Sequence, residues 1–134
     1  MSSPPPRPRV LAVNTDSGVL ALLSKALEDA GYEPIPMRLA DLNVGGGLLP
    51  FATRLLPDAI VYDVGPPYVE NWSRLQGVLA TGAITMPVIV TSTDPEAFRD
   101  HIGSGKVYAL VGKPFELGTL TNELRAALDH RGVS

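Results

Sequence analysis

The chain has 134 residues, of which 45% are hydrophobic and 19% charged, with a formal net charge of −3 and no cysteine. This is the composition of one globular domain with its own core, and it argues against nucleic-acid binding through a basic surface, against disulfides and against a membrane span. Residues 1–8 are rich in Ser, Pro and Arg without the apolar stretch of a signal peptide. We therefore expect a flexible extension at residues 1–8, a single domain at residues 9–131 and a cytoplasmic location.

A continuous apolar run at residues 10–13 predicts a strand buried on both faces. Asp16 or Ser17 can accept hydrogen bonds from the first backbone N–H groups of the helix that follows. This helix is expected to end at Gly31. Its inner face is predicted to be a stripe at helical spacing, formed by Val19, Leu20, Leu22, Leu23, Ala26 and Leu27.

Residues 33–39 predict a second strand, and its prolines 34 and 36 place it at a sheet edge, because proline has no backbone N–H to donate. Residues 41–47 contain three consecutive glycines and predict a flexible loop. A phosphate-binding loop is not favoured there, since no Lys-Ser/Thr pair follows the glycines. Residues 48–56 predict a short helix.

Residues 59–62 predict a third strand, buried on both faces, which ends at Asp63 and is followed by a Gly-Pro-Pro turn. In an open α/β sheet, ligands bind at the carboxyl ends of the strands. Asp63 is therefore the first candidate functional residue. The alternative is an aspartate that only starts the turn.

Residues 68–80 predict a helix in which Trp72 is a packing or partly exposed residue and the inner face consists of Val69, Leu75, Val78 and Leu79. Residues 86–91 predict a fourth strand that leads to Ser92. A short helix begins at Asp94, followed by a fifth strand at residues 107–111. The last helix is predicted to bury Leu117, Leu120, Leu124, Ala127 and Leu128.

Five strands that alternate with helices predict an α/β fold with a doubly wound parallel sheet and helices on both faces. The flavodoxin-like strand order 2-1-3-4-5 places the proline-containing strand at an edge. In this order Asn14, Thr15 and Asp63 share one crevice, with Ser92 and Lys113 on its other wall. The convergence of these polar residues predicts a site.

Several motifs occur in an order and at spacings known from one protein family. With them, residues 8–130 resemble the receiver domain of two-component response regulators, the family of the chemotaxis response regulator. The motifs are Leu27 to Tyr32, Pro57-Asp58 with Asp63, Pro87-Val88-Ile89 and Lys113-Pro114-Phe115.

The resemblance implies a role for several residues. Asp63 matches the aspartate that accepts a phosphoryl group from a histidine kinase, Lys113 the lysine that neutralises this group, and Ser92 the hydroxyl that reorients toward it. Thr91 is the alternative hydroxyl if the fourth strand is aligned one residue earlier. Pro67 matches a proline of the following loop. These residue types suit the chemistry, because a carboxylate is a nucleophile and phosphoryl transfer depends on positioning and positive charge.

The chain departs from the family where a pair of acidic residues helps to hold Mg²⁺. Asn14 and Thr15 occupy those positions, while Asp63 and Gly65 match the other metal-binding positions. Asp16 lies one residue further and is interpreted as a helix cap. Because Mg²⁺ is normally held by carboxylates together with water and phosphate oxygens, we expect weak or absent Mg²⁺ binding.

A second departure is Leu110, which stands where the family usually has an aromatic residue that moves with the switch hydroxyl. Tyr108 is not at the matching position. Without an acidic pair to repel it, Asp63 can pair directly with Lys113. We therefore expect a pocket that is quiet at rest.

The leading hypothesis is a receiver domain of phosphorelay signal transduction, a phosphoprotein and signalling module rather than an enzyme. Its expected partners are a histidine kinase or phosphotransfer protein and a downstream protein that contacts the surface of residues 94–128, with no nucleic acid and no membrane. A homodimer is left open. The alternative is a pseudo-receiver that binds proteins independently of phosphorylation.

A third hypothesis is a flavodoxin-like cofactor binder or small enzyme. It would need a phosphate-cradling loop after the first strand, where residues 14–18 are short. Hydrolytic catalysis is not expected, because His101 and His130 are predicted at the surface rather than at strand ends.

Overall fold

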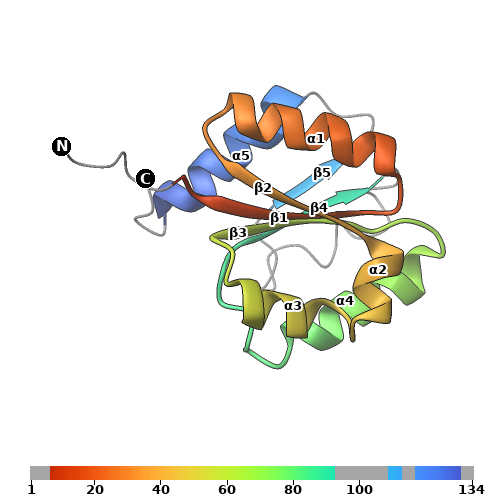
Figure 1. The fold of residues 1–134 in the computed structure, drawn as a ribbon. Helices are drawn as coiled ribbons and strands as arrows, with labels where there is room; N and C mark the ends of the chain where they lie inside the picture. Colours follow the sequence, from red (N-terminus) through yellow and green to blue (C-terminus); the bar gives the residue numbers. More distant parts are fainter. Residues whose placement is uncertain (1–6, 93–108, 113–116, 131–134) are drawn as a thin grey trace.

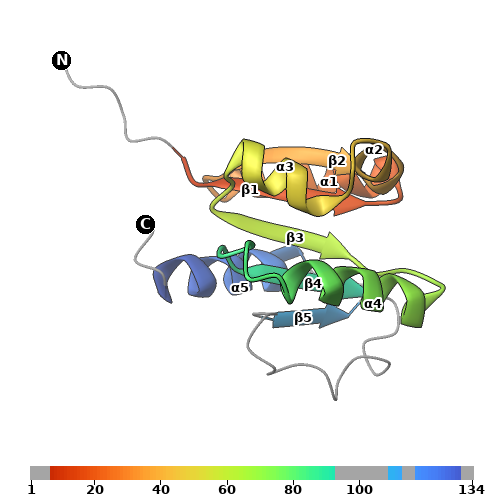
Figure 2. The same cartoon turned by 90° about the horizontal axis from the view of Figure 1, so that it is seen from below.

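The structure, a computed structural model, describes residues 7–92, 109–112 and 117–130. Within these ranges one sheet of five parallel strands has the order β2-β1-β3-β4-β5 (Figures 1 and 2). This confirms the predicted doubly wound, flavodoxin-like order. The strands are β1 (Arg9–Asn14), β2 (Glu33–Arg38), β3 (Ala59–Asp63), β4 (Val88–Ser92) and β5 (Ala109–Gly112).

Helices cover both faces of the sheet. The first and last helices lie on one face and the other three on the opposite face (Figure 1). No helix in the described ranges is long and apolar enough to cross a membrane. The helices are α1 (Ser17–Asp29), α2 (Leu39–Val44), α3 (Leu48–Leu55), α4 (Tyr68–Leu79) and α5 (Leu117–His130).

The burial of the strands follows their sequences. Every residue of β3 is buried, as are five of the six residues of β1, and both strands consist largely of apolar side chains. Strand β2, which carries Pro34 and Pro36, is half exposed and lies at the sheet edge. The prediction that the prolines mark the edge strand is confirmed, since an edge strand leaves one side of its backbone without ladder hydrogen bonds.

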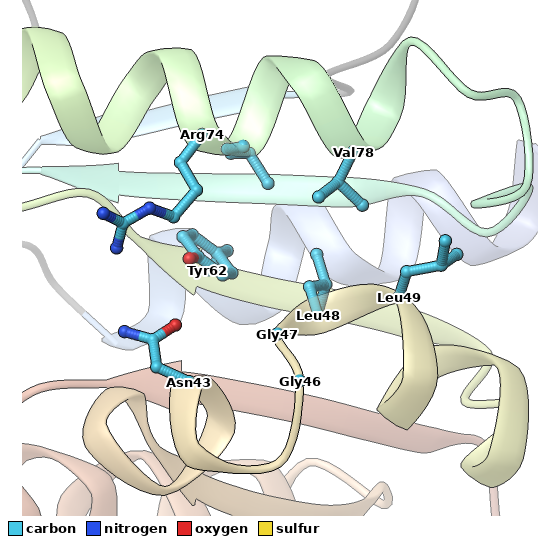
Figure 3. A pocket seen from close by; sticks show the side chains of 9 residues that line it. Asn43, Gly46, Gly47, Leu48, Leu49, Tyr62, Arg74 and Val78 are labelled. Carbon is cyan, nitrogen blue, oxygen red and sulfur yellow. The ribbon is translucent and has the colours of Figure 1, made fainter.

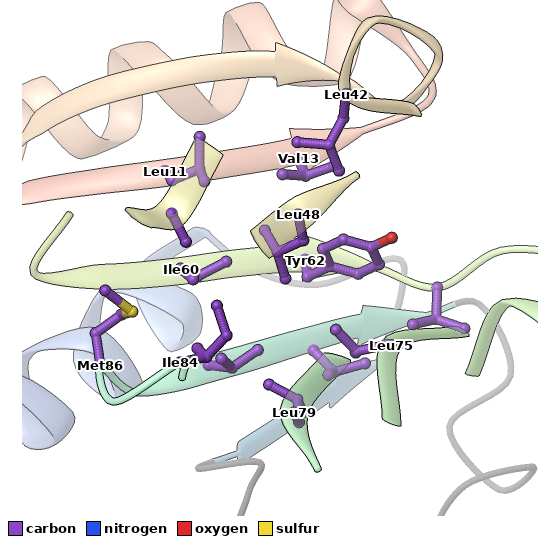
Figure 4. Packing of buried hydrophobic residues seen from close by; sticks show 14 of the residues in the cluster. Leu11, Val13, Leu42, Leu48, Ile60, Tyr62, Leu75, Leu79, Ile84 and Met86 are labelled. Carbon is purple, nitrogen blue, oxygen red and sulfur yellow. The ribbon is translucent and has the colours of Figure 1, made fainter. Parts of the chain in front are cut away.

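Two hydrophobic clusters fill the space between the sheet and its helices. Residues at alternate strand positions supply each cluster, because successive side chains of a strand point to opposite faces. Leu11, Val13, Ile60 and Tyr62 join the cluster beneath α2, α3 and α4 (Figure 4). The cluster beneath α1 and α5 contains Val10, Ala12, Ala59, Val61 and Ile89 together with Leu20, Leu23, Leu27, Leu120, Leu124 and Leu128.

The loop predicted at residues 41–47 is wrong in its first part, which belongs to helix α2. The fully buried side chain of Leu42 anchors this helix to the core. Only the glycines after it form a turn, with φ angles of +101° at Gly46 and +94° at Gly47, values that favour glycine. The glycine run dominated the local pattern, whereas the burial of Leu42 depends on the folded sheet.

The predicted inner faces of two helices need correction. Val69 and Leu22 are 77% and 64% exposed, so neither belongs to the core as the helical stripes suggested. Trp72 takes the inner position in α4 and is 4% exposed. Strand β4 runs to Ser92, one residue beyond its predicted end. The helix at Asp94, residues 107 and 108 of the fifth strand and Lys113 lie outside the described residues.

Candidate functional site

Asp63, Asn14 and Thr91 lie side by side at the carboxyl edge of the sheet. Thr91 is paired with Asp63 across β3 and β4. The β1–β3 register runs to the pair Val13 and Tyr62, so Asn14 and Asp63 are the next residues on each strand. Alternation along the strands places all three side chains toward α1 and α5, the side on which Ala12, Val61 and Ile89 are buried.

All three side chains are almost fully buried. Asp63 is 3% exposed, and Asn14 and Thr91 are each 1% exposed. A polar group loses its contacts with water on burial and needs hydrogen-bond partners inside the protein. The partners of these three residues therefore define the resting state of the site.

The Thr91 hydroxyl donates a hydrogen bond of 2.8 Å to Oδ1 of Asp63. In the resemblance to receiver domains, Ser92 is the predicted switch hydroxyl and Thr91 is the alternative. Ser92 is fully buried and, by alternation, lies on the other face of β4. Strand register was the signal that could have pointed to Thr91, and the switch role of Ser92 stays a prediction.

Asn14 makes one hydrogen bond with its carbonyl oxygen and none with its amide nitrogen. Its Oδ1 accepts a bond of 3.0 Å from the backbone N–H of Asp16. Its Nδ2 is buried without a hydrogen-bond partner among the described residues. The asparagine thus fixes the start of the following loop, and among the described residues its amide nitrogen has no acceptor although it lies next to Asp63.

Asp16 caps α1, which confirms its interpretation as a helix cap. Its Oδ1 accepts hydrogen bonds from the backbone N–H groups of Gly18 at 2.7 Å and Val19 at 3.2 Å. Thr15, which we placed in the crevice with Asn14 and Asp63, is exposed. The structure therefore brings one of the two residues that replace the acidic pair into the buried row.

The backbone carbonyl of Gly65, at a position that matches the family's metal site, accepts a hydrogen bond of 2.8 Å from Nδ2 of Asn71. Asn71 lies in the first turn of α4 and ties the loop after β3 to that helix. Sequence reasoning missed this residue, because its role depends on the path of the loop.

Tyr62 precedes Asp63 in β3 and lies in the cluster on the opposite face of the sheet. Burial raises the pKa of its phenol above the ordinary value of 10.0; Arg74 opposes this shift and the Asp63 carboxylate adds to it. Lys113, predicted as the cation next to Asp63, lies outside the described residues.

No family model matches the chain. The transcriptional regulatory protein PrrA of Mycobacterium tuberculosis is 34% identical over 127 residues, which cover 93% of this chain and 52% of that protein. The transcriptional regulatory protein KdpE of the same species is 31% identical over 126 residues, covering 89% of this chain and 50% of that protein. The chain thus spans about half the length of the curated relatives it matches.

Solved structures share the fold. The chemotaxis protein CheY4 of Vibrio cholerae is 26% identical, with a TM-score of 0.70, over 91% of this chain and 99% of that chain. The receiver domain of the Francisella response regulator 1452 has a TM-score of 0.75 at 22% identity, over 92% of this chain and 98% of that chain. The likeness covers almost the whole of both structures.

Proposed function

Because the chain is a receiver domain of the response-regulator kind, we propose that Asp63 is its phosphoacceptor and that the reaction proceeds with a weakened Mg²⁺ site. The observation that carries this proposal is the position of Asp63, a buried carboxylate at the carboxyl end of the central strand β3, next to the hydroxyl of Thr91. Ligands of open α/β sheets bind at this edge.

In the proposed reaction an oxygen of Asp63 attacks the phosphorus of a phosphohistidine. The P–N bond breaks, the leaving imidazole nitrogen takes a proton from water, and an acyl phosphate forms on Asp63. The Thr91 hydroxyl and the Asn14 amide are the neutral donors in the buried row that can hold oxygens of the transferred group. The predicted cation is Lys113.

The donor set around Asp63 fits Mg²⁺ poorly, and this supports the weakened metal site. Mg²⁺ requires oxygen ligands in near-octahedral geometry and is usually bound through one or two carboxylates. Asp63 is the one carboxylate in the buried row, and Asn14 replaces a charged oxygen with a neutral amide. The Asp16 carboxylate caps α1, and the Gly65 carbonyl already accepts a hydrogen bond.

The alternative function, a pseudo-receiver that acts by protein contact alone, is favoured by one observation. Asp63 is nearly inaccessible, and one of its oxygens already accepts the hydroxyl of Thr91. A carboxylate satisfied in this way can serve as a structural element of the sheet edge. The same experiment separates the two functions.

The test is incubation with phosphoramidate, whose P–N bond stands in for that of phosphohistidine, over a series of Mg²⁺ concentrations, followed by intact-mass measurement. We expect slow gain of one phosphoryl group, with a rate that rises with Mg²⁺ without levelling off at a few millimolar. Asp63→Asn should abolish the gain, and Asp41→Asn, a control at an exposed position of α2, should leave it unchanged.

Two results would contradict the proposal. No phosphoryl gain up to tens of millimolar Mg²⁺ would favour the pseudo-receiver. Rapid and complete phosphorylation at low Mg²⁺ would show that the site binds the metal well despite Asn14.

As partners we propose a histidine kinase or phosphotransfer protein as donor and a downstream protein that contacts the surface of residues 94–128, both in the cytoplasm. Of that surface the structure describes β5 and the part of α5 up to residue 128. The relatives' role as transcriptional regulatory proteins belongs to chains about twice as long.

A further inference from the structure

A cavity of about 450 Å³ lies on the face of the sheet opposite to the Asp63 row. It is open to solvent on one side and is lined by the turn between α2 and α3, by the N-terminal end of α3, by α4 and by Tyr62 of β3 (Figure 3). Its volume falls in the range of roughly 300–1,000 Å³ that is typical of small-molecule sites.

One end of the cavity is polar. The guanidinium group of Arg74, the hydroxyl of Tyr62 and the side-chain amide of Asn43 gather on the same side of the Tyr62 ring (Figure 3). The Tyr62 side chain is only 5% exposed, and within the described ranges its hydroxyl makes no hydrogen bond. Arg74 likewise has no carboxylate within 4.0 Å in the part of the chain that the structure describes.

The start of α3 brings backbone donors to the same cavity, whereas the N–H groups of Gly46 and Gly47 already bond to the carbonyls of Asn43 and Leu42. Gly46 and Gly47 line the cavity, and α3 begins directly after them. The N-cap residue Gly47 has no side chain that could cap the first N–H groups of this eight-residue helix. These groups and the positive end of the helix dipole favour a negatively charged ligand.

The rest of the lining is apolar. Leu48, Leu49 and Val78 face the cavity from α3 and α4, and Leu75 completes the wall. A site with an apolar wall and a few convergent polar groups suits a molecule with an apolar body and one polar end. The guanidinium of Arg74, an exposed side chain at the rim, sets the charge of that end.

We propose that this cavity binds a small organic anion, with its carboxylate against Arg74 and Tyr62 and its apolar body along Leu49 and Val78. Guanidinium and phenol groups are strong donors to a carboxylate. The site is separate from Asp63, whose side chain lies on the other face of the sheet, so the proposal does not depend on phosphorylation.

The test is titration of the ¹⁵N-labelled protein with 3-phenylpropionate, and with its neutral amide as a matched ligand of the same shape. We expect saturable amide shifts at Gly46, Gly47 and Val78 in the millimolar range, and weaker binding of the neutral amide. Arg74→Gln should weaken carboxylate binding about tenfold, the usual effect of losing a charge-assisted hydrogen bond. Lys25→Gln, which removes a charge on the other face of the sheet, should leave binding unchanged.

Tyr62→Phe retains the ring in the core and removes the hydroxyl alone, so it should weaken binding about threefold or more. Asp63→Asn should bind the ligand as the unsubstituted protein does, which separates this site from the proposed phosphoacceptor. Three results would overturn the proposal: equal affinity for acid and amide, affinity unaffected by Arg74→Gln, or no saturable shifts up to tens of millimolar ligand. Thermal unfolding of each variant confirms that it remains folded.

Discussion

Asn14 gives the Asp63 site a neutral amide where an acidic side chain would create repulsion. Two buried carboxylates on adjacent strands disfavour each other's charged form until a cation separates them. With asparagine at this position, Asp63 lies between two side chains that can donate hydrogen bonds, those of Asn14 and Thr91. We therefore expect the resting protein to need no metal ion to relieve charge at this edge.

Replacing Asn14 with aspartate should create the repulsion between two buried carboxylates that asparagine avoids. Without Mg²⁺ we expect Asn14→Asp to lower the free energy of unfolding by about 1–3 kcal/mol, because two carboxylates then lie in adjacent positions. Mg²⁺ should restore part of the loss by binding the folded state. Urea denaturation with and without Mg²⁺ measures both effects. The exposed control Asn122→Asp should show neither, and an Asn14→Asp protein that is equally stable and insensitive to Mg²⁺ would contradict this explanation.

The hydrogen bond from Thr91 to Asp63 can be tested by removing the hydroxyl while keeping the shape of the side chain. Thr91→Val should lower the free energy of unfolding by about 1–3 kcal/mol, since it leaves a buried carboxylate oxygen without its donor. Thr91→Ser keeps the hydroxyl and loses one methyl group, at a cost of about 1 kcal/mol. A valine variant that is as stable as the serine variant would show that the bond contributes little.

The turn between α2 and α3 depends on close packing of its first glycine against the ring of Phe51. A Cβ atom at Gly45 would lie 2.5 Å from two ring carbons, closer than atoms can approach. Gly45 therefore allows the chain to turn from the end of α2 toward α3 while packed against this ring. The same turn also shapes the cavity near Arg74, because Gly46 and Gly47 line that cavity.

Two glycine-to-alanine substitutions should change stability in opposite directions. Gly45→Ala should destabilise the protein by about 1–3 kcal/mol, since the ring must move. Gly77→Ala should stabilise it by about 0.5–1 kcal/mol, because Gly77 lies inside α4 and a Cβ atom there meets nothing within 4 Å. Thermal or urea unfolding of both variants measures the two changes in stability. Destabilisation by Gly77→Ala would contradict the open space that the structure shows beside Gly77.

The packing of the molecule determines how its tyrosines titrate. Burial raises the pKa of Tyr62 and Tyr32 above 10.0, although an arginine near each opposes the shift. The folded state thus holds the phenol protons more tightly than the unfolded state. The resulting stabilisation is fully present below pH 10 and is lost as the pH rises through the folded-state pKa values.

Absorbance titration of the phenolate band should therefore show Tyr62 and Tyr32 ionising above the ordinary pKa of 10.0. Arg74→Gln should raise the pKa of Tyr62 further, because it removes the charge that favours the phenolate. Lys25→Gln should leave the titration unchanged. A lower pKa for Tyr62 in the Arg74 variant would place the guanidinium away from the phenol.

Much of this fold could be predicted from local sequence. Proline at positions 34 and 36 specifies an edge strand and continuous apolar runs specify central strands, since both depend on properties of the strand itself. Helix α2 could not be found in this way, because Leu42 is buried only once the sheet is in place. The inner face of α4 was misjudged for the same reason, as the rotation of the helix is set by its contacts.

The functional site also contains residues that local sequence could identify and residues whose role depends on the folded structure. The end of an apolar strand identified Asp63, and the departures from the family pattern identified Asn14. Thr91 was ranked second because alignment counts residues along the chain, whereas its bond to Asp63 depends on the register of β3 and β4. Asn71 and the cavity near Arg74 depend on contacts between distant segments, and no local pattern indicates them.

The most direct test of the proposed weakened metal site is a Mg²⁺ titration of the unsubstituted protein followed by the amide shift of Asp63, in parallel with the double variant Asn14→Asp, Thr15→Asp. We predict no saturation in the unsubstituted protein up to tens of millimolar, and saturable binding at low millimolar concentrations once both carboxylates are introduced. Saturable low-millimolar binding by the unsubstituted protein would contradict this account.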